Sequence, residues 1–562
     1  MAGSVWSRLA LALASVALVA AGTVGTASAH GTTVHRQSGA NIGWTMTGNN
    51  IEGWRYSTAS QITPANANDL KAAWTFVAEN TPGGTENCFH RGKVKPCTPT
   101  TTAQIPGGVE DTPLVIGNTM YVTTAFNRVY ALNASTGQLI WAYNPDDGFQ
   151  VACCGPDARG LAYHDGTLYL NTLDDRLIAL DAATGAVKWT VMINSPKHGV
   201  AETAAPLFYD GNIYIGSSGS ELGIRGFEEA RSAATGKLKW IFYTVPPRNQ
   251  SWVKLNHGIA GGTVWNNPVI DPATGLMYID TANPAPLLYA KNRPGPDHWT
   301  DSVVALNPAT GKMVWAQQQV PHDIWDYDNS ANPVVFPTGD GWGVGVPGKS
   351  GMYWEYSAKS GQLLTTPVCF VTCMHAYSPP LKGSIVVAPA ALGGDNWSQP
   401  AYDPQTHDVV LAGINSFAKV HSSPKGDVYQ AGKLETYLGS TLTILPGTTG
   451  TMTAINVNTG TIDWQVKLPT ASEGGPVVTA GGLAIGNSTN DGILYLVNVK
   501  TGQVVRTINM NDPIGGGDVT YEVNGRQFIV VPVGGAGSQQ GTGKLLGKVT
   551  SEFVVFSLGG AK

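Results

Sequence analysis

The chain has 562 residues, with 34 Lys and Arg against 39 Asp and Glu, so its formal net charge is −5 at neutral pH. A mildly acidic chain of this kind is not expected to bind nucleic acid or an anionic lipid surface. Its 69 Gly and 35 Pro, without a long segment of helical periodicity after residue 29, argue against an α/β fold.

The first 29 residues predict a signal peptide. Arg8 precedes an apolar run from Leu9 to about Ala21, and Ala27–Ala29 supplies the small-x-small pattern that a signal peptidase cleaves. The run is short for a membrane span, and no second run follows it. We therefore expect an exported protein, periplasmic or extracellular, whose mature chain begins near His30 and has no membrane span.

The mature chain repeats itself. Each copy has an apolar strand, an Asx-x-x-Thr-Gly turn and a second strand that ends in Trp, and the clearest copies end at Trp141, Trp189 and Trp315. Weaker copies end at Trp240 and Trp464. The Gly of the turn falls at positions 137, 185, 236, 311, 361, 460 and 502. We assign the gap between 361 and 460 to a degenerate copy at Tyr402–His407.

Eight units of roughly fifty residues match the period of a four-stranded propeller blade. The Gly supplies the positive φ of the turn, and the Trp can fill the space between neighbouring blades. We therefore predict an all-β fold, an eight-bladed β-propeller that forms a single domain over residues 30–562. A cofactor would sit where the loops between strands line the mouth of the central channel.

The six cysteines of an exported chain predict disulfides. Cys88 and Cys97 form one close pair, Cys369 and Cys373 another, and Cys153-Cys154 are adjacent. Adjacent Cα atoms lie about 3.8 Å apart, below the usual disulfide range of about 4.4–6.8 Å, so a bond between them would strain the backbone. A fold keeps such strain where it has a use, although two free or separately paired thiols are the alternative. No Cys-x-x-Cys-His occurs, which excludes a c-type haem on this chain.

Five segments resemble the quinoprotein alcohol dehydrogenases of the methanol and ethanol dehydrogenase type, which use pyrroloquinoline quinone (PQQ). They are Ala152–Gly160, Gly216–Gly226, Gly261–Trp265, Asn283–Pro286 and Pro321–Asp328. The resemblance implies that the chain oxidises an alcohol to an aldehyde or ketone by hydride transfer to metal-bound PQQ. It also implies a separate electron acceptor, such as a soluble cytochrome c, and it is compatible with a homodimer.

PQQ is a flat tricarboxylate, so its site must sandwich the rings and neutralise the carboxylates. By resemblance, a Cys153-Cys154 disulfide stacks on one face of PQQ and Trp265 on the other. The residues that match positions bonding the oxygens of PQQ are Glu110, Arg159, Thr203, Ser218, Lys349 and Asn396. The polarity of an ordinary strand explains Thr203 and Ser218 equally well.

The resemblance also implies a metal ion and a general base. Glu221 and Asn283 match the metal ligands of the family, and Asp326 matches the base, which also binds the metal. Asp328 resembles the extra carboxylate of lanthanide-dependent members, where calcium enzymes usually have a small residue. Because another carboxylate favours a trivalent ion, we expect a lanthanide(III) ion. Ca²⁺ is the alternative if Asp328 only accepts a hydrogen bond from the loop.

Two positions depart from the pattern of the family. Glu473-Gly474-Gly475 stands where Trp-Gly-Gly is usual, and Ala282 stands where Gly is common. A carboxylate near a tricarboxylate is unfavourable unless it meets the metal, Lys349 or water. These departures leave the substrate open.

Two other interpretations therefore remain. The substrate could be a secondary or polymeric alcohol or a sugar, with Glu473 and the loop from about Cys369 to Ala390 shaping a wider mouth. Alternatively, the chain could be a non-catalytic propeller scaffold for exported proteins. A scaffold would need the repeats but not the set of PQQ and metal residues.

Overall fold

The computed structural model describes residues 41–78, 109–147, 156–194, 200–246, 260–288, 293, 295–377, 383–421, 441–534 and 551–559, and the backbone of 87–90, 93–96 and 105–106. Residues 41–562 form one compact unit. The predicted signal peptide, residues 1–29, lies outside the described residues, as do Cys97, Cys153 and Cys154. In the described part of the chain, no helix has both the length and the apolar character needed to cross a membrane.

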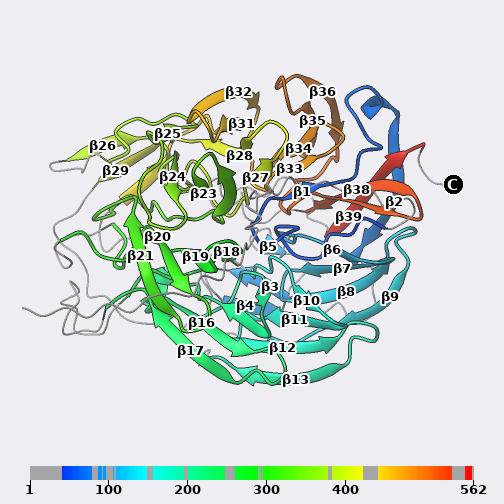
Figure 1. Ribbon diagram of the computed structural model, residues 1–562, viewed down its shortest axis with the longest axis horizontal. Helices are drawn as coiled ribbons and strands as arrows, with labels where there is room; N and C mark the ends of the chain where they lie inside the picture. The colour runs from blue at the N-terminus through cyan, green and yellow to red at the C-terminus, as the bar shows by residue number, and fades with distance from the viewer. Residues whose placement is uncertain are drawn as a thin grey trace, which may run out of the picture. The chain divides into compact units, whose positions relative to one another are not determined.

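Eight antiparallel sheets of four principal strands make up the described part of this unit, and Figure 1 shows them around a common centre. Blade 1 contains β6 (Leu114–Ile116), β7 (Thr119–Thr124), β8 (Arg128–Asn133) and β9 (Leu139–Tyr143). Blade 2 contains β10 (Ala162–His164), β11 (Thr167–Asn171), β12 (Arg176–Asp181) and β13 (Val187–Met192). Blade 3 contains β14 (Leu207–Tyr209), β15 (Asn212–Ile215), β16 (Phe227–Ser232) and β17 (Leu238–Tyr243). Blade 4 contains β18 (Val269–Asp271), β19 (Leu276–Asp280), β20 (Ser302–Asn307) and β21 (Lys312–Gln318).

The second half of the chain continues the series. Blade 5 contains β22 (Val334–Thr338), β23 (Gly341–Pro347), β24 (Met352–Ser357) and β25 (Val368–Cys369). Blade 6 contains β27 (Ala401–Asp403), β28 (Asp408–Asn415), β31 (Thr449–Asn456) and β32 (Thr461–Leu468). Blade 7 contains β33 (Val477–Thr479), β34 (Leu483–Ser488), β35 (Ile493–Asn498) and β36 (Val504–Asn509), and β1 (Tyr56–Ser57) pairs with β33 in parallel. Blade 8 contains β37 (Val519–Val523), β38 (Arg526–Val533) and β39 (Glu552–Leu558), with β2 (Leu70–Val77) as its outermost strand.

Blade 8 closes the ring because its strands come from both ends of the described chain. β2 pairs antiparallel with β39, and Figure 1 shows the blue β2 beside the orange and red strands of the last blade. The predicted eight-bladed propeller is therefore confirmed. The assignment of the eighth repeat to Tyr402–His407 was wrong, since these residues form the end of β27 and the turn to β28 inside blade 6. Blade 8 has no Thr-Gly turn of its own because its outer strand is supplied by β2.

The repeated Trp and Gly residues join neighbouring blades, as predicted. The Trp ring of one blade covers the turn Gly of the next, where a Cβ on Gly185 would lie 2.7 Å from the ring of Trp141. The indole Nε1 of Trp141 also donates a hydrogen bond to the carbonyl of Ala182, at 3.1 Å. The same arrangement pairs Trp74 with Gly137, Trp189 with Gly236, Trp240 with Gly311, Trp315 with Gly361 and Trp464 with Gly502. Only Gly can occupy these turns, because each combines a positive φ with an indole at van der Waals contact.

Smaller elements lie outside the blades. One three-stranded sheet contains β26 (Ser384–Val387), β29 (Ala418–His421) and β30 (Thr441–Ile444), and another contains β3 (Asn87–His90), β4 (Lys93–Pro96) and β5 (Ile105–Pro106). Two short 3-10 helices are η1 (Ala67–Asp69) and η4 (Ser220–Leu222). The strands β29 and β30 interrupt blade 6 between β28 and β31, which accounts for the long interval between the Gly turns.

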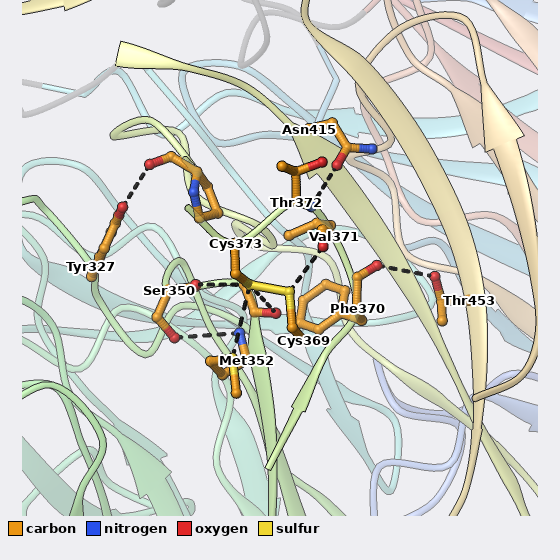
Figure 2. The surroundings of a disulfide bond; sticks show 12 residues. Tyr327, Ser350, Met352, Cys369, Phe370, Val371, Thr372, Cys373, Asn415 and Thr453 are labelled. Carbon is orange, nitrogen blue, oxygen red and sulfur yellow. Dashed lines mark hydrogen bonds between the residues drawn. A yellow bond between two sulfur atoms is a disulfide. The ribbon is translucent and has the colours of Figure 1, made fainter. Parts of the chain in front are cut away.

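The disulfide predicted for the pair Cys369 and Cys373 is present. Figure 2 shows it beside Ser350 and Met352, at the start of β24. Ser350 directly follows Lys349, so the disulfide packs behind the turn that carries this lysine. A Cβ on Gly351 would lie 3.2 Å from the sulfur of Cys373, which shows how closely the turn and the disulfide are packed.

Candidate active site

A cavity of about 490 Å³ lies where the loops between strands converge at one end of the blades. This volume is in the range of small-molecule sites. Its lining comes from blades 2 to 6 and from β30, and comprises Asp157, Arg159, Thr203, Ser218, Gly219, Glu221, Thr263, Trp265, Asn283, Asp326, Asp328, Lys349, Ala391, Leu392, Asn396, Trp397, Leu442, Thr443 and Ile444. Functional side chains thus stand on connections held by a rigid ring of sheets.

The cavity brings together most of the residues predicted from the sequence. Ten of them line it, namely Arg159, Thr203, Ser218, Glu221, Trp265, Asn283, Asp326, Asp328, Lys349 and Asn396. Glu110 is not part of the lining, but its carboxylate lies behind Arg159. Cys153 and Cys154 lie outside the described residues.

Lys349 is the centre of the acidic side of the cavity. Its Nζ lies 3.0 Å from Oδ1 of Asp326 and 3.1 Å from Oδ2 of Asp328, and all three side chains are largely buried. Burial alone would lower the pKa of Lys349, but the surrounding carboxylates raise it above its ordinary value. Lys349 therefore stays charged and holds both aspartates in place.

Asp328 also fixes two other residues of the cavity. Its Oδ1 accepts a hydrogen bond from the backbone N–H of Asn283 at 2.8 Å, and its Oδ2 accepts one from the indole of Trp265 at 3.1 Å. Asp328 thus accepts hydrogen bonds from two other loops of the cavity. Asn283 is fully buried, and its Oδ1 has no hydrogen-bond partner among the residues that the structure describes. That oxygen remains available to a ligand.

The loop that carries Asp326 is rigid. Asp326 has a φ of 72°, which is rare for a residue other than Gly and marks a conformation imposed by its surroundings. The carboxylate of Asp323 accepts hydrogen bonds from the backbone N–H groups of Trp325 and Tyr327, at 2.8 and 3.0 Å. The hydroxyl of Tyr327 donates to the carbonyl of Pro389 at 2.6 Å. Burial raises the pKa of Asp326, and Lys349 opposes that effect.

Glu221 stands on η4, between Gly219 with a φ of 103° and Gly223 with a φ of 77°. This Gly-rich turn places Glu221 in the lining of the cavity. Burial raises its pKa, and Asp328 raises it further. Within the described residues, no three His, Cys, Asp or Glu side chains converge closely enough to hold a metal ion by themselves. The donor set of Glu221, Asp326 and Asp328 with the unpartnered Asn283 oxygen nevertheless suits a hard cation, because all four supply oxygen.

Arg159 is the centre of the side of the cavity that lies opposite Lys349 and its aspartates. Its guanidinium lies 5.2 Å from the ring centre of Trp265 and 5.4 Å from that of Trp397. It donates to Oγ1 of Thr203 at 2.8 Å and forms an ion pair with Glu110, at 2.9 Å between Nη2 and Oε2. A planar cation between aromatic rings suits a flat, anionic ligand. By contrast, the hydroxyl of Ser218 donates to the carbonyl of Ala201 at 2.7 Å, as a polar residue of an ordinary strand would.

One wall of the cavity is apolar and was not predicted. Leu442 and Ile444 alternate along β30, and both pack against the buried cluster that contains Trp325 and Tyr327. Leu392 extends this wall. The wall therefore lies beside the two residues that flank Asp326. No motif marks β30 in the sequence, whereas Asp157 and Trp397, also missed, stand within or next to recognised segments.

Glu473 lies outside the cavity lining and is fully buried. It is not an ion partner of Lys349, whose partners are Asp326 and Asp328. Neither carboxylate oxygen of Glu473 has a hydrogen-bond partner in the described part of the chain. Burial raises the pKa of Glu473 to about 8, and the nearby carboxylate of Glu110 contributes to the rise.

Comparison with known proteins places these observations in a family. The family model described as the β-propeller domain of PQQ-dependent glucose, ethanol and alcohol dehydrogenases matches residues 44–368 and 353–529. Subunit 1 of the cytochrome c methanol dehydrogenase of Paracoccus denitrificans is 27% identical, over 88% of this chain and 83% of that protein. A lanthanide-dependent methanol dehydrogenase of Methylorubrum extorquens is 28% identical, over 90% of this chain and 89% of that protein. The solved structure of a europium-containing methanol dehydrogenase superposes with a TM-score of 0.78 at 27% identity, covering 92% of this chain and 98% of that one.

Proposed function

Because the chain belongs to the family of PQQ-dependent alcohol dehydrogenases, we propose that its cavity oxidises alcohols with an apolar chain, with Asp326 as the general base. The observation that carries this proposal is the convergence on one cavity of ten predicted residues, seven from the five shared segments and three, Thr203, Lys349 and Asn396, from outside them. A non-catalytic scaffold would have no use for that convergence.

The residues present fit both PQQ and a metal ion. Arg159 and Lys349 offer positive charge to carboxylates, Trp265 offers a flat face, and Glu110, Thr203, Ser218 and Asn396 offer polar atoms nearby. Glu221, Asn283, Asp326 and Asp328 would hold the ion. When bound, PQQ supplies a two-electron acceptor and the metal ion supplies Lewis acidity. Cys153 and Cys154 would complete the site by stacking on PQQ.

Asp326 would accept the proton of the alcohol hydroxyl. The hydrogen bond from Lys349 to its Oδ1 orients the carboxylate and leaves the other oxygen to face the cavity. The hydrogen bonds made by Asp323 and Tyr327 hold the loop in this geometry when substrate enters. A base that is fixed before the reaction avoids the cost of orienting it during each turnover.

The apolar wall favours an alcohol over a sugar. Leu392, Leu442 and Ile444 can cover an alkyl or aryl chain while its hydroxyl points towards Asp326. The hydroxyls of a sugar would lose hydrogen bonds to water at this wall, which is unfavourable. A primary or secondary alcohol with such a chain is the proposed substrate class.

We propose a lanthanide(III) ion as the metal and Ca²⁺ as the alternative. Support comes from Asp328, which adds a third carboxylate to the lining of the cavity that also contains Glu221, Asp326 and Asn283. Three carboxylates suit a trivalent ion better than a divalent one. The single ammonium of Lys349 offsets only part of their negative charge.

We further propose that the protein is exported after cleavage near Ala29 and passes electrons to a separate acceptor, such as a soluble cytochrome c. The apolar segment at residues 9–21 and the lack of a Cys-x-x-Cys-His motif support these two points.

The test uses the full-length apo-protein, reconstituted with PQQ and either LaCl₃ or CaCl₂, and follows dye reduction with ethanol, hexanol, benzyl alcohol or glucose. We expect activity with LaCl₃ and a higher kcat/KM for hexanol or benzyl alcohol than for glucose. Activity with CaCl₂ alone would overturn the lanthanide assignment. Glucose as the best substrate would overturn the substrate class, and inactivity with every pair would overturn the proposed function.

A further inference from the structure

Behind the cavity lies a second group of acids, of which the proposed site uses only Glu110. Glu110, Asp395 and Glu473 are each no more than 5% exposed. Glu110 stands behind Arg159, and Asp395 directly precedes Asn396; Arg159 and Asn396 both line the cavity. Glu473 interacts electrostatically with both Glu110 and Asp395, so it links the acid behind Arg159 with the acid next to Asn396.

Positive charge is scarce around these three acids. Arg159 is the ion partner of Glu110, but it also lies 3.7 Å from Asp157. On the other side, Arg55 donates to the carbonyl oxygens of Gly475, Pro476 and Asp518. Asp518 is itself a buried acid, and burial raises its pKa to about 7. The charged groups with described contacts around these acids are therefore Arg159 and Asp157 beside Glu110, and Arg55 and Asp518 beside the backbone that follows Glu473. Asp111, which follows Glu110 in the chain, is a further buried acid.

Backbone contacts fix this arrangement. The N–H of Glu473 donates to Oγ1 of Thr489 at 2.9 Å, and the N–H of Gly517 donates to the carbonyl of Asp111 at 2.9 Å. A Cβ on Gly474 would contact the carbonyl of Gly516, so the segments that carry Glu110 and Glu473 are packed together through this pair of glycines. Glu473 cannot easily move away from Glu110, and neither oxygen of Glu473 has a described hydrogen-bond partner.

We propose that Glu473, together with Glu110 and Asp395, stores a proton behind the cofactor cavity, so that the tricarboxylate PQQ binds together with proton uptake. The inference rests on the proposed function, since it assumes that PQQ enters this cavity. A bound tricarboxylate adds negative charge to a region where buried carboxylates already outnumber cations, and protonation of Glu473 removes one of the charges.

Because PQQ binding is coupled to proton uptake by Glu473, the affinity for PQQ must fall as the pH rises. Glu473 has a pKa of about 8 before PQQ binds, and a nearby anion raises it further. Below about pH 7 the proton is already present, so PQQ affinity hardly changes with pH. Above about pH 8 each binding event takes up the proton, and the Kd for PQQ rises about tenfold per pH unit.

The experiment is calorimetric titration of PQQ into the full-length apo-protein at pH 8.5, at one fixed CaCl₂ concentration, in two buffers of different ionisation enthalpy. We expect uptake of about one proton by the wild-type protein, and clearly less by Glu473→Gln. Asp340→Asn, an exposed acid in the turn between β22 and β23, is the matched control and should behave as the wild type. The same uptake in Glu473→Gln and the wild type would overturn the inference.

A second measurement needs no variant. The infrared spectrum of the wild-type apo-protein should show a protonated carboxylic acid band whose intensity falls by at least one carboxyl group between pH 6.5 and pH 9.5. Absence of that band would overturn the inference even if Glu473→Gln did not fold. Failure of the apo-protein to bind PQQ would instead contradict the proposed function, so the two failures can be told apart.

Discussion

Two groups of buried carboxylates lie on either side of the cavity wall, and they are held differently. Asp326 and Asp328 share the ammonium of Lys349 at 3.0 and 3.1 Å, and Asp328 accepts two further hydrogen bonds. Among the described residues, the carboxylate of Glu473 has neither an ion partner nor a hydrogen-bond donor. A paired acid can remain ionised and act as a base or a ligand, whereas an unpaired buried acid is stable only with its proton. The difference assigns Asp326 and Asp328 to chemistry and Glu473, the unpaired member of the second group, to proton storage.

Replacing Asp326 tests the first group most directly. Asp326→Asn keeps the shape of the side chain but cannot accept the alcohol proton, so we expect kcat to fall by about 10²- to 10⁴-fold. PQQ binding should persist, because Arg159 and Trp265 are unchanged. Dye reduction gives kcat, and the absorbance of the purified protein gives the bound PQQ. Wild-type activity in this variant would remove Asp326 from the role of base.

Lys349→Met removes the shared cation. Asp326 and Asp328 are then left buried without their ion partner, which should lower the free energy of unfolding of the apo-protein by about 3–5 kcal/mol at neutral pH. Urea unfolding followed by Trp fluorescence measures the change. Lys312→Met, on the exposed start of β21, is the control and should have little effect. An unchanged stability in Lys349→Met would show that the two aspartates do not depend on this pair.

Glu473→Gln tests the second group without any cofactor. The pKa of Glu473 is about 8 in the folded chain, against an ordinary value of 4.5. The stability that it contributes is therefore fully present below pH 4.5 and lost as the pH rises towards 8. Relative to Glu473→Gln, the wild-type protein should lose about 1.4 kcal/mol of unfolding free energy per pH unit in this window. Urea unfolding at pH 5, 6.5 and 8 measures it, and a gain for the wild type with rising pH would mean that Glu473 is ionised and paired.

The fold could be predicted from the sequence because one structural element is repeated. In the clearest copies the Thr-Gly turn is followed by a strand that contains Trp, and this Trp meets the Gly of the next blade, as Trp141 meets Gly185. The prediction failed where that element is absent. Blade 8 takes its outer strand from β2, and blade 6 is interrupted by β29 and β30, so the turn at Tyr402–His407 was mistaken for a repeat.

The site was predictable where residues lie in compact segments that the family shares, as Asp326 and Asp328 do. The apolar wall of β30 carries no such segment, and only the folded chain brings Leu442 and Ile444 to the cavity. Glu473 could be identified as unusual, but the sequence does not reveal that Lys349 is already engaged by two other acids. Whether a buried acid has an ion partner depends on which cations lie near it, and that is a property of the tertiary structure.

Of the substitutions at Asp326, Asp328 and Lys349, Asp328→Ala disturbs the ion pairs least, because Asp326 keeps its contact with Lys349. The variant removes one carboxylate oxygen donor and one negative charge, so the preference for La³⁺ over Ca²⁺ in reconstituted activity should fall by about tenfold or more. It also removes the acceptor of the Trp265 indole and of the Asn283 N–H, which would weaken PQQ binding with either metal. Asp328→Asn separates these effects, since it keeps an oxygen acceptor but not the charge. If Asp328→Asn retains the wild-type metal preference, Asp328 is a hydrogen-bonding residue of the loop and the lanthanide assignment loses its main support.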